Sequence, residues 1–240
     1  MLRIALAAAG ILLAAAGGSD LGPVEAPEVP WSASDPACSP KLSPLDCHLN
    51  VAEREFFRRF AGTARRVDPK TVAVRLRDGS EATIGNRNDC RVQDEFYTES
   101  ACATATPIFY FDKRGYFLFE TSFYEGGGFL LVSDRDGSQT QLSATPHFSP
   151  DGSSFTVVSG PTVAQDGSNA VEVWDLRGGT PALDFRYEPP DSLWGYWFIG
   201  WDGPNRIALS YRTWLDGHEE RPAHAIRTAS GWSIVEDQAN

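Results

Sequence analysis

The chain has 240 residues, of which 42% are hydrophobic and 22% charged, and this length allows one domain to bury a complete core. Asp and Glu number 32 against 21 Lys and Arg, so the formal net charge is −11. A surface of that sign repels phosphate backbones, which argues against nucleic acid as a partner and favours cations or a basic protein. A role of the charge in solubility alone is equally consistent with the composition.

The first residues predict export from the cytoplasm. Arg3 supplies a positive start, Ile4–Leu13 form a short apolar run, and Ala14–Ala16 give the small residues that signal peptidase reads. We expect a signal peptide over residues 1–16, cleaved before Gly17. The apolar run is shorter than the roughly 20 residues that cross a bilayer, and no later segment approaches that length. The sequence therefore predicts a periplasmic or secreted protein without stable membrane insertion.

Four cysteines, Cys38, Cys47, Cys90 and Cys102, follow in this exported chain. An even number of cysteines in an oxidising compartment predicts disulfides. Of the three possible pairings we favour Cys38 with Cys47 and Cys90 with Cys102, because both close short loops rich in turn residues. Neither pair has the C-x-x-C spacing of a zinc site, and His48 beside Cys47 is the only hint of one. We therefore predict no metal and no cofactor.

The part of the chain before the β-rich region has two segments. Residues 17–48 are rich in proline, which disfavours helices and central strands, so we expect an extended lead-in over the surface. A helix is predicted over 50–61, with Asn50 as N-cap and Glu53 as its capping-box partner. Its apolar face, which we expect to dock on a sheet, carries Phe56, Phe57 and Phe60.

The rest of the chain, within a single domain over 49–240, has the alternation of β-strands. Segments 71–76 and 81–84 flank Asp78-Gly79 and predict a hairpin. Three units then follow, each an aromatic strand that ends in an Asp/Gly turn and three further strands. The aromatic strands with their turns are at 108–115, 147–152 and 198–203, the second strands at 116–121, 155–159 and 206–211, the third at 129–133, 170–175 and 222–228, and the fourth at 139–142, 182–187 and 232–235.

Consecutive four-stranded units of about 40 to 50 residues are typical of propeller blades, which bury their faces by stacking on one another. The predicted fold class is therefore all-β and mostly antiparallel, a small or partial β-propeller-like domain with one N-terminal amphipathic helix. A β-sandwich is the alternative, because antiparallel meanders give the same local pattern in sequence.

One of these units carries a family resemblance. Thr145–Val157, with the run His147-Phe148-Ser149-Pro150-Asp151-Gly152, resembles the P-x-F-S-P-D-G signature of the WD40-like repeats in TolB-type propellers. Val171–Leu176 is similar to the strand and Trp-Asp step that follows in such blades. The resemblance covers one blade, Pro146–Leu176, and the neighbouring units keep only the turn aspartates Asp112 and Asp202. It implies protein–protein contact through loops at one end of a propeller.

No catalytic motif stands out in the sequence. The four histidines, His48, His147, His218 and His224, have no metal-ligand spacing and no G-x-S-x-G elbow. Asp134 and Asp136 lack the further oxygen ligands of a calcium loop, so we expect a β-turn with solvent-facing acids there. The run Gly126-Gly127-Gly128 is interpreted as a hairpin connection. Enzyme activity is therefore uncertain and less favoured than binding.

Aromatic residues are concentrated between Trp194 and Trp214. Tyr196 and Phe198 share one face of a strand while Trp197 and Ile199 share the other, which predicts a strand buried on both faces. Trp214 lies beyond that strand, in the loop 212–222, where a ring beside several acids suits a basic or glycan partner. The predicted binding residues are Trp214, Asp216, His218, Glu219 and Glu220.

The sequence thus favours an extracytoplasmic, non-enzymatic binding or scaffold protein that recognises an envelope protein or a cell-wall component. One alternative is a secreted or periplasmic hydrolase or carbohydrate-binding module that uses blade loops. Another is an acidic periplasmic inhibitor of a basic hydrolase, suggested by export, charge and disulfides. A pocket that holds His147 with a pair of carboxylates would favour the enzyme, whereas a flat rim with exposed Trp214 would favour binding.

Overall fold

The computed structural model describes residues 21, 25–30, 32, 34–38, 43–85, 104–123, 126–160, 169–190, 194–213 and 220–236. These residues form one helix, α1, and strands β1 to β15 in four antiparallel sheets, with no closed barrel among them. The predicted signal peptide, Cys90 and Cys102 lie outside the described residues. Within the described part, no helix has the length and apolarity needed to cross a bilayer.

Each sheet is a meander in chain order. The first contains β1 (Ala64–Asp68), β2 (Thr71–Arg75) and β3 (Glu81–Gly85). The second contains β4 (Thr104–Phe111), β5 (Tyr116–Phe123), β6 (Gly126–Ser133) and β7 (Gln139–Leu142). The third contains β8 (Pro146–Phe148), β9 (Ser154–Ser159), β10 (Ala170–Asp175) and β11 (Ala182–Tyr187). The fourth contains β12 (Trp194–Trp201), β13 (Arg206–Thr213), β14 (Glu220–Thr228) and β15 (Gly231–Glu236).

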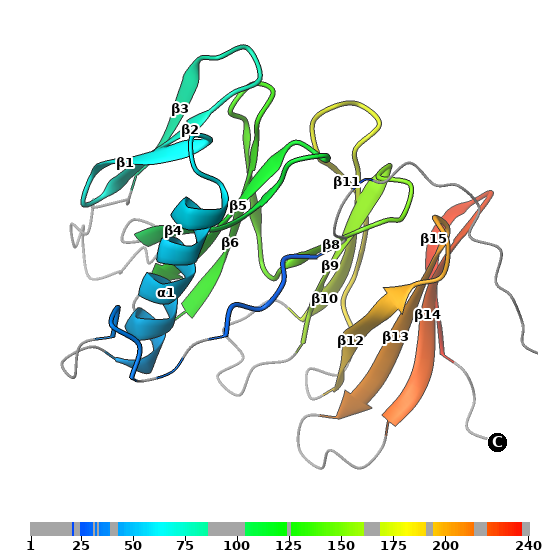
Figure 1. Ribbon diagram of the computed structural model, residues 1–240. Helices are drawn as coiled ribbons and strands as arrows, with labels where there is room; N and C mark the ends of the chain where they lie inside the picture. The colour runs from blue at the N-terminus through cyan, green and yellow to red at the C-terminus, as the bar shows by residue number, and fades with distance from the viewer. Residues whose placement is uncertain are drawn as a thin grey trace, which may run out of the picture.

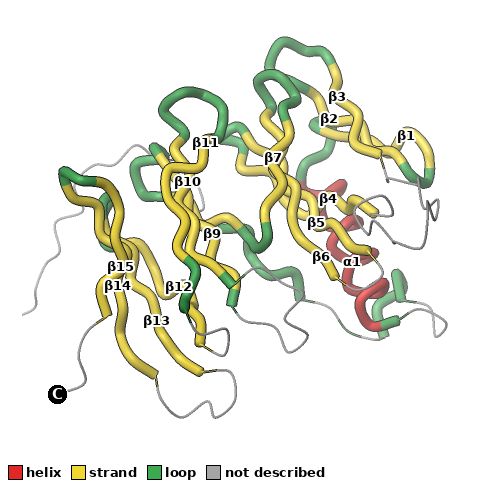
Figure 2. Tube along the Cα trace, turned by 180° about the vertical axis from the view of Figure 1, so that it is seen from behind, coloured by secondary structure: helices red, strands yellow, loops and turns green. Residues whose placement is uncertain are grey.

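The four sheets lie side by side in the order of the chain (Figure 2). Because strands in a meander alternate direction, the turn between the first and second strands and the turn between the third and fourth lie at the same end of each sheet. Backbone hydrogen bonds join these turns in pairs, from Asp134 N to Gly115 O and from Leu176 N to Ser153 O, both 2.9 Å long. We call this end of the molecule the turn end.

The predicted all-β class and the three four-stranded units are confirmed, and β10 and β11 have the predicted bounds. The predicted hairpin is confirmed as β2 and β3, and its sheet has an additional strand, β1, whose short polar sequence shows little alternation. One local prediction is wrong. Gly126–Gly128 begin β6 instead of forming a connection, and a Cβ on Gly128 would lie only 2.8 Å from Leu142 O, so the close approach of β7 favours glycine there.

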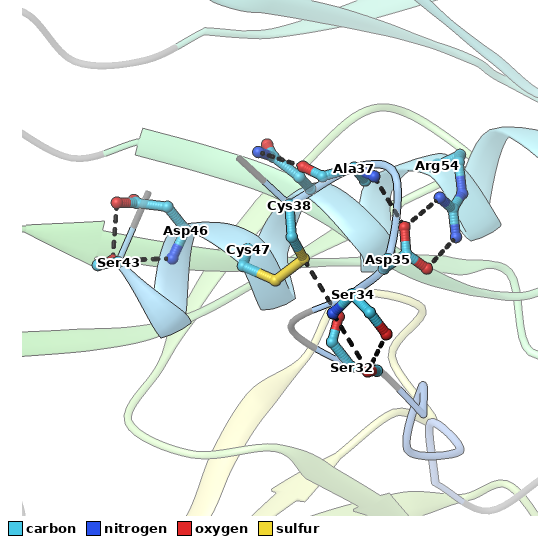
Figure 3. Close-up of a disulfide and its surroundings, with 10 residues drawn as sticks. Ser32, Ser34, Asp35, Ala37, Cys38, Ser43, Asp46, Cys47 and Arg54 are labelled. Carbon is cyan, nitrogen blue, oxygen red and sulfur yellow. Dashed lines mark hydrogen bonds and ion pairs between the residues drawn. A yellow bond between two sulfur atoms is a disulfide. The ribbon is translucent and has the colours of Figure 1, made fainter. Parts of the chain in front are cut away.

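Helix α1 spans Pro44–Arg59 and therefore starts earlier than the predicted N-cap, Asn50, would place it. The N-cap is Ser43, whose Oγ accepts a hydrogen bond of 3.1 Å from Asp46 N, and Pro44 occupies the first turn, where its missing N–H costs nothing. The predicted disulfide between Cys38 and Cys47 is present and holds the lead-in on that turn (Figure 3). Arg54 adds a bidentate ion pair to Asp35 in the same segment.

The helix packs against β4 and the first sheet (Figure 1). Phe56 is 1% exposed in a cluster that includes Val72, Val74, Phe117 and Phe119, so docking through this residue is confirmed. Phe60, predicted to dock beside it, is the C-cap and only half-buried, with its ring 5.3 Å from Phe109. The fully buried apolar side chains of α1 therefore lie before its C-cap, at Val51, Ala52 and Phe56.

Hydrophobic clusters fill the spaces between successive sheets. The cluster between the second and third sheets includes Phe111, Leu118, Phe148, Phe155 and Val157. The cluster between the third and fourth sheets includes Val171, Val173, Tyr196, Ile207 and Trp232. Since the core is divided into layers, each sheet depends on its neighbour to bury a face.

The prediction that the strand at 196–199 is buried on both faces is wrong for one of them. Tyr196 is 1% exposed on the side of the third sheet, whereas Ile199, at the register shift between Phe198 and Gly200, is 62% exposed. No further sheet among the described residues covers the outer face of the fourth sheet, because β12–β15 end the row (Figure 2).

Candidate binding site

A pocket of about 570 Å³ lies where the third and fourth sheets meet at their first strands, β8 and β12. Its volume is in the range of small-molecule sites. The residues that line it come from the lead-in, β8, the turn after β8, β9 and β12: Glu25, His147, Pro150, Val158, Trp197, Phe198, Ile199, Gly200 and Trp201. We refer to it as the aromatic pocket.

The polar side of the aromatic pocket is a carboxylate–imidazole pair. His147 Nδ1 lies 2.9 Å from Glu25 Oε2, and the imidazole stacks on Phe198 with 3.9 Å between ring centroids. Alternation along β8 explains the direction of His147, since its neighbour Phe148 points to the second sheet. Glu25 arrives from the extended lead-in, which runs from α1 toward β8 (Figure 1).

Burial sets the protonation state of this pair. The His147 side chain is 18% exposed, and loss of hydration lowers the pKa of His147 below its usual value, an effect that the Glu25 carboxylate opposes. The imidazole is therefore mostly neutral at neutral pH. Because Glu25 is 54% exposed, its carboxylate remains available to a ligand from solvent.

The aromatic side of the pocket is formed by β12. The register between β12 and β13 shifts between Phe198 and Gly200, which leaves Ile199 in a bulge that faces outward. Trp201 Nε1 donates a hydrogen bond of 2.9 Å to His147 O and so connects the two walls. The Arg212 guanidinium lies 4.1 Å from the centre of the Trp197 ring and holds that ring in place.

This combination suits binding better than covalent chemistry. Among the described residues that line the pocket there is no serine, threonine or cysteine, and Glu25 is the single carboxylate, so these residues provide neither a nucleophile nor an acid pair. No group of three metal-ligating side chains occurs among the residues that the structure describes. Rings with a polar rim are typical of sites that hold a ligand by stacking and hydrogen bonds.

The predicted binding loop is only partly described. Trp214, Asp216, His218 and Glu219 lie outside the described residues. Glu220 begins β14, is exposed, and accepts a hydrogen bond of 2.5 Å from Ser210 Oγ. It does not line the aromatic pocket, but its partner in the β13–β14 register is Arg212, which covers Trp197.

Sequence reasoning missed the most informative contact of the site. Glu25 and His147 are 122 positions apart, and nothing in a proline-rich segment indicates which strand it crosses. The signal that was available is the run of aromatic residues along β12, although the bulge at Ile199 breaks its alternation.

No protein-family model matches this chain, and neither a curated protein nor a solved structure does. Function is therefore inferred from the geometry of the aromatic pocket.

Proposed function

We propose that this chain is an extracytoplasmic, non-enzymatic binding protein that recognises a cell-wall glycan through the aromatic pocket. The observation that carries the proposal is the pocket itself, in which Trp197 and Trp201 line a space shared with Glu25. Sugar rings present apolar C–H faces and hydroxyl edges, so aromatic rings contact the faces while a carboxylate accepts from hydroxyls.

A finer description of the fold belongs to the same proposal. The sheets would be blades of a partial TolB-type propeller in which β4, β8 and β12 are the inner strands. In support, the Phe111 and Phe148 rings of β4 and β8 lie 4.8 Å apart, and the His147 and Phe198 rings of β8 and β12 lie 3.9 Å apart. The lead-in segment and α1 would then cover part of the inner edge that further blades occupy in a larger propeller.

The periplasmic or secreted location of the proposal is supported by the N-terminal sequence and by the Cys38–Cys47 disulfide, because disulfides persist in oxidising compartments. An envelope protein as partner is the competing form of the proposal, and binding experiments separate the two.

The test uses the chain without residues 1–16, titrated with an oligosaccharide of N-acetylglucosamine and followed by calorimetry and tryptophan fluorescence. We expect saturable binding that Trp197→Ala weakens by about 2 kcal/mol or more, because a central aromatic contact is lost. The matched control is Leu183→Ala, which truncates a strand residue that is 47% exposed outside the pocket, against Ile199→Ala inside it. Absence of binding, or equal losses in both aliphatic variants, would contradict the proposal.

Incubation with the same oligosaccharide decides between binding and hydrolysis. The His147–Glu25 pair is the one feature of the pocket that a hydrolase would use, as an oriented general base. Mass spectrometry of the oligosaccharide after prolonged incubation should show an unchanged chain length. Shorter products that disappear with His147→Gln would replace the binding proposal with an enzyme.

A further inference from the structure

A second cavity, of about 420 Å³, lies at the turn end and shares no lining residue with the aromatic pocket. Turns of the first three sheets surround it: the β2–β3 turn supplies Arg77, the β4–β5 turn Lys113 and Arg114, and the β6–β7 turn Arg135. Asp134, Asp151, Leu21, Gly115, Tyr116, Ser133, Gly152, Leu176 and Gly179 complete the lining. We refer to it as the cationic cavity.

The charges of the cationic cavity do not cancel. Among the described residues, four Lys and Arg side chains line it against the two carboxylates of Asp134 and Asp151, so four minus two leaves a net charge of +2 for this part of the lining. This sign is opposite to that of the chain, whose formal net charge is −11. At physiological ionic strength the Debye length is about 8 Å, so distant acids are largely screened from an anion in the cavity.

Both carboxylates are already engaged within the protein. Asp134, predicted from the sequence to face solvent, is 2% exposed, and its Oδ2 accepts a hydrogen bond of 2.8 Å from the Tyr110 hydroxyl. Arg77 Nε lies 2.7 Å from Asp134 Oδ1, outside good hydrogen-bond alignment, so this contact is an ion pair. Asp151 accepts a hydrogen bond of 2.7 Å from Ser149 Oγ and one of 3.1 Å from Ser153 N.

Arg77, Lys113 and Arg135 are exposed to solvent, and two of them lie against glycines of neighbouring turns. Gly115 and Gly179 have φ of +81° and +83°, and a Cβ at these positions would collide with Arg77 Nη2 and with Arg135 Nη1, respectively. Glycine thus provides both the left-handed backbone and the room for a guanidinium. Arg114 is fixed separately, 4.9 Å from the centre of the Phe148 ring, and donates a hydrogen bond of 3.2 Å to Ser149 O. The cavity therefore gathers positive groups from three turns, of which Arg114 is the half-buried one.

We propose that the cationic cavity binds the phosphate group of a small phosphorylated ligand. Guanidinium groups match phosphate oxygens through paired N–H donors, and the Lys113 ammonium adds a compact point charge. The positive side chains reach the cavity from three turns, which suits the tetrahedral phosphate better than a planar carboxylate. A phosphate dianion also balances the net charge of +2 that the lining residues carry.

This site is independent of the proposed glycan site, since the two share no lining residue. The phosphate group has two possible sources, a soluble phosphorylated compound or the headgroup of an anionic lipid. Both present the same chemistry to the cavity, and the experiment below separates them.

The test titrates the chain without residues 1–16 with pyrophosphate by calorimetry, in a buffer free of other multivalent anions. We expect one saturable site whose affinity falls about tenfold or more in Arg135→Gln, since a charge-assisted contact is removed. Arg58→Gln is the matched control, because the Arg58 side chain is 73% exposed on α1 and does not line the cavity. Its affinity should stay within about twofold of the unsubstituted chain.

Two further measurements identify the source of the phosphate and test the site with a second variant. Vesicles of phosphatidylcholine with phosphatidic acid should bind in an Arg135-dependent manner if the ligand is a lipid headgroup, and should not bind if it is soluble. Gly179→Ala gives a second variant, because its Cβ would displace the Arg135 guanidinium, and it should also weaken pyrophosphate binding. No saturable binding to either probe, or an equal loss in Arg58→Gln, overturns the proposal.

Discussion

The interfaces on the two faces of the third sheet are built differently. Toward the second sheet, Phe111, Phe148 and Phe155 meet with at most 1% exposure and carry no polar group. Toward the fourth sheet, the rings have donors that reach across: Trp201 Nε1 binds His147 O at 2.9 Å, and Trp232 Nε1 binds Asp184 Oδ2 at 3.2 Å. The first interface buries apolar ring surface, whereas the second also has hydrogen bonds that fix the orientation of its rings.

The difference explains why the aromatic pocket lies beside the second of these interfaces. The phenylalanine rings of the first interface interdigitate and leave no space among themselves, since such cores pack as densely as organic crystals. The hydrogen-bonded interface orients its rings through their N–H groups, and beside it the aromatic pocket remains open. Stability is therefore expected to depend most on the first interface, and ligand binding on the second.

The largest effect is expected from Phe148→Ala. This side chain is fully buried between the second and third sheets, with its ring 4.8 Å from Phe111 and 5.5 Å from Phe155. Its removal leaves a cavity and should cost about 3 to 5 kcal/mol of unfolding free energy in urea titrations. The exposed Ile199→Ala should change it by less than about 0.5 kcal/mol. Similar losses in both variants would mean that the first interface is not the stabilising one.

The disulfide gives the next largest effect and lies outside both interfaces. Replacing Cys38 and Cys47 by serine opens a link between positions 9 apart, which should cost about 2 to 3 kcal/mol through the entropy of the unfolded chain. Thermal unfolding measures the loss.

Much of the fold follows from local sequence, and the comparison shows why the rest does not. Alternation and Asp/Gly turns predict strands because the apolar residues at every second position mark the buried face within the strand itself. Which sheet covers that face depends on tertiary packing. The exposure of Ile199 and the burial of Asp134 are therefore not predicted from local sequence. The sequence predicts a helix start at Asn50 because Asn50 and Glu53 have capping spacing. Ser43 and Asp46 have the same spacing, and the structure uses them instead. The Glu25–His147 contact of the site has no local signal at all.

A smaller effect is expected from Tyr196→Phe, which tests a hydrogen bond within the fourth sheet, next to the second interface. The Tyr196 hydroxyl donates a hydrogen bond of 2.7 Å to Glu236 Oε1, and burial raises the pKa of Tyr196, so the group remains a donor. Its loss should cost about 1 to 2 kcal/mol, while the ring packing is kept. Tyr187→Phe is the control in the same cluster and should be nearly neutral. If the two variants unfold alike, the hydrogen bond contributes nothing.

The smallest effect is a pH dependence confined to the second interface. Burial lowers the pKa of His147 in the folded state below the value of 6.5 of an unperturbed histidine, although Glu25 opposes the shift. As the pH falls through 6.5 the unfolded chain takes up this proton first, so the stability that His147 contributes is complete above this pH and is lost on acidification.

We expect the melting temperature to decrease between about pH 7.5 and 5.5, and His147→Gln to remove part of that decrease. Carboxylates with lowered pKa values, such as Asp151, act at more acidic pH and do not interfere in this range. An unchanged pH profile in His147→Gln would show that other groups set the dependence.

The strictly sequential strand order has a consequence for how the chain reaches its structure. In the described part, every strand pairs with its neighbour in the chain, so the contacts within a sheet are local in sequence. Folds with low contact order form quickly, and modular folds of this kind open in units instead of all at once. The fourth sheet has an exposed outer face and one layer of core, so its amides should exchange with deuterium before those of the second and third sheets. The part of the molecule that holds the aromatic wall would then be the first to open and the last to form.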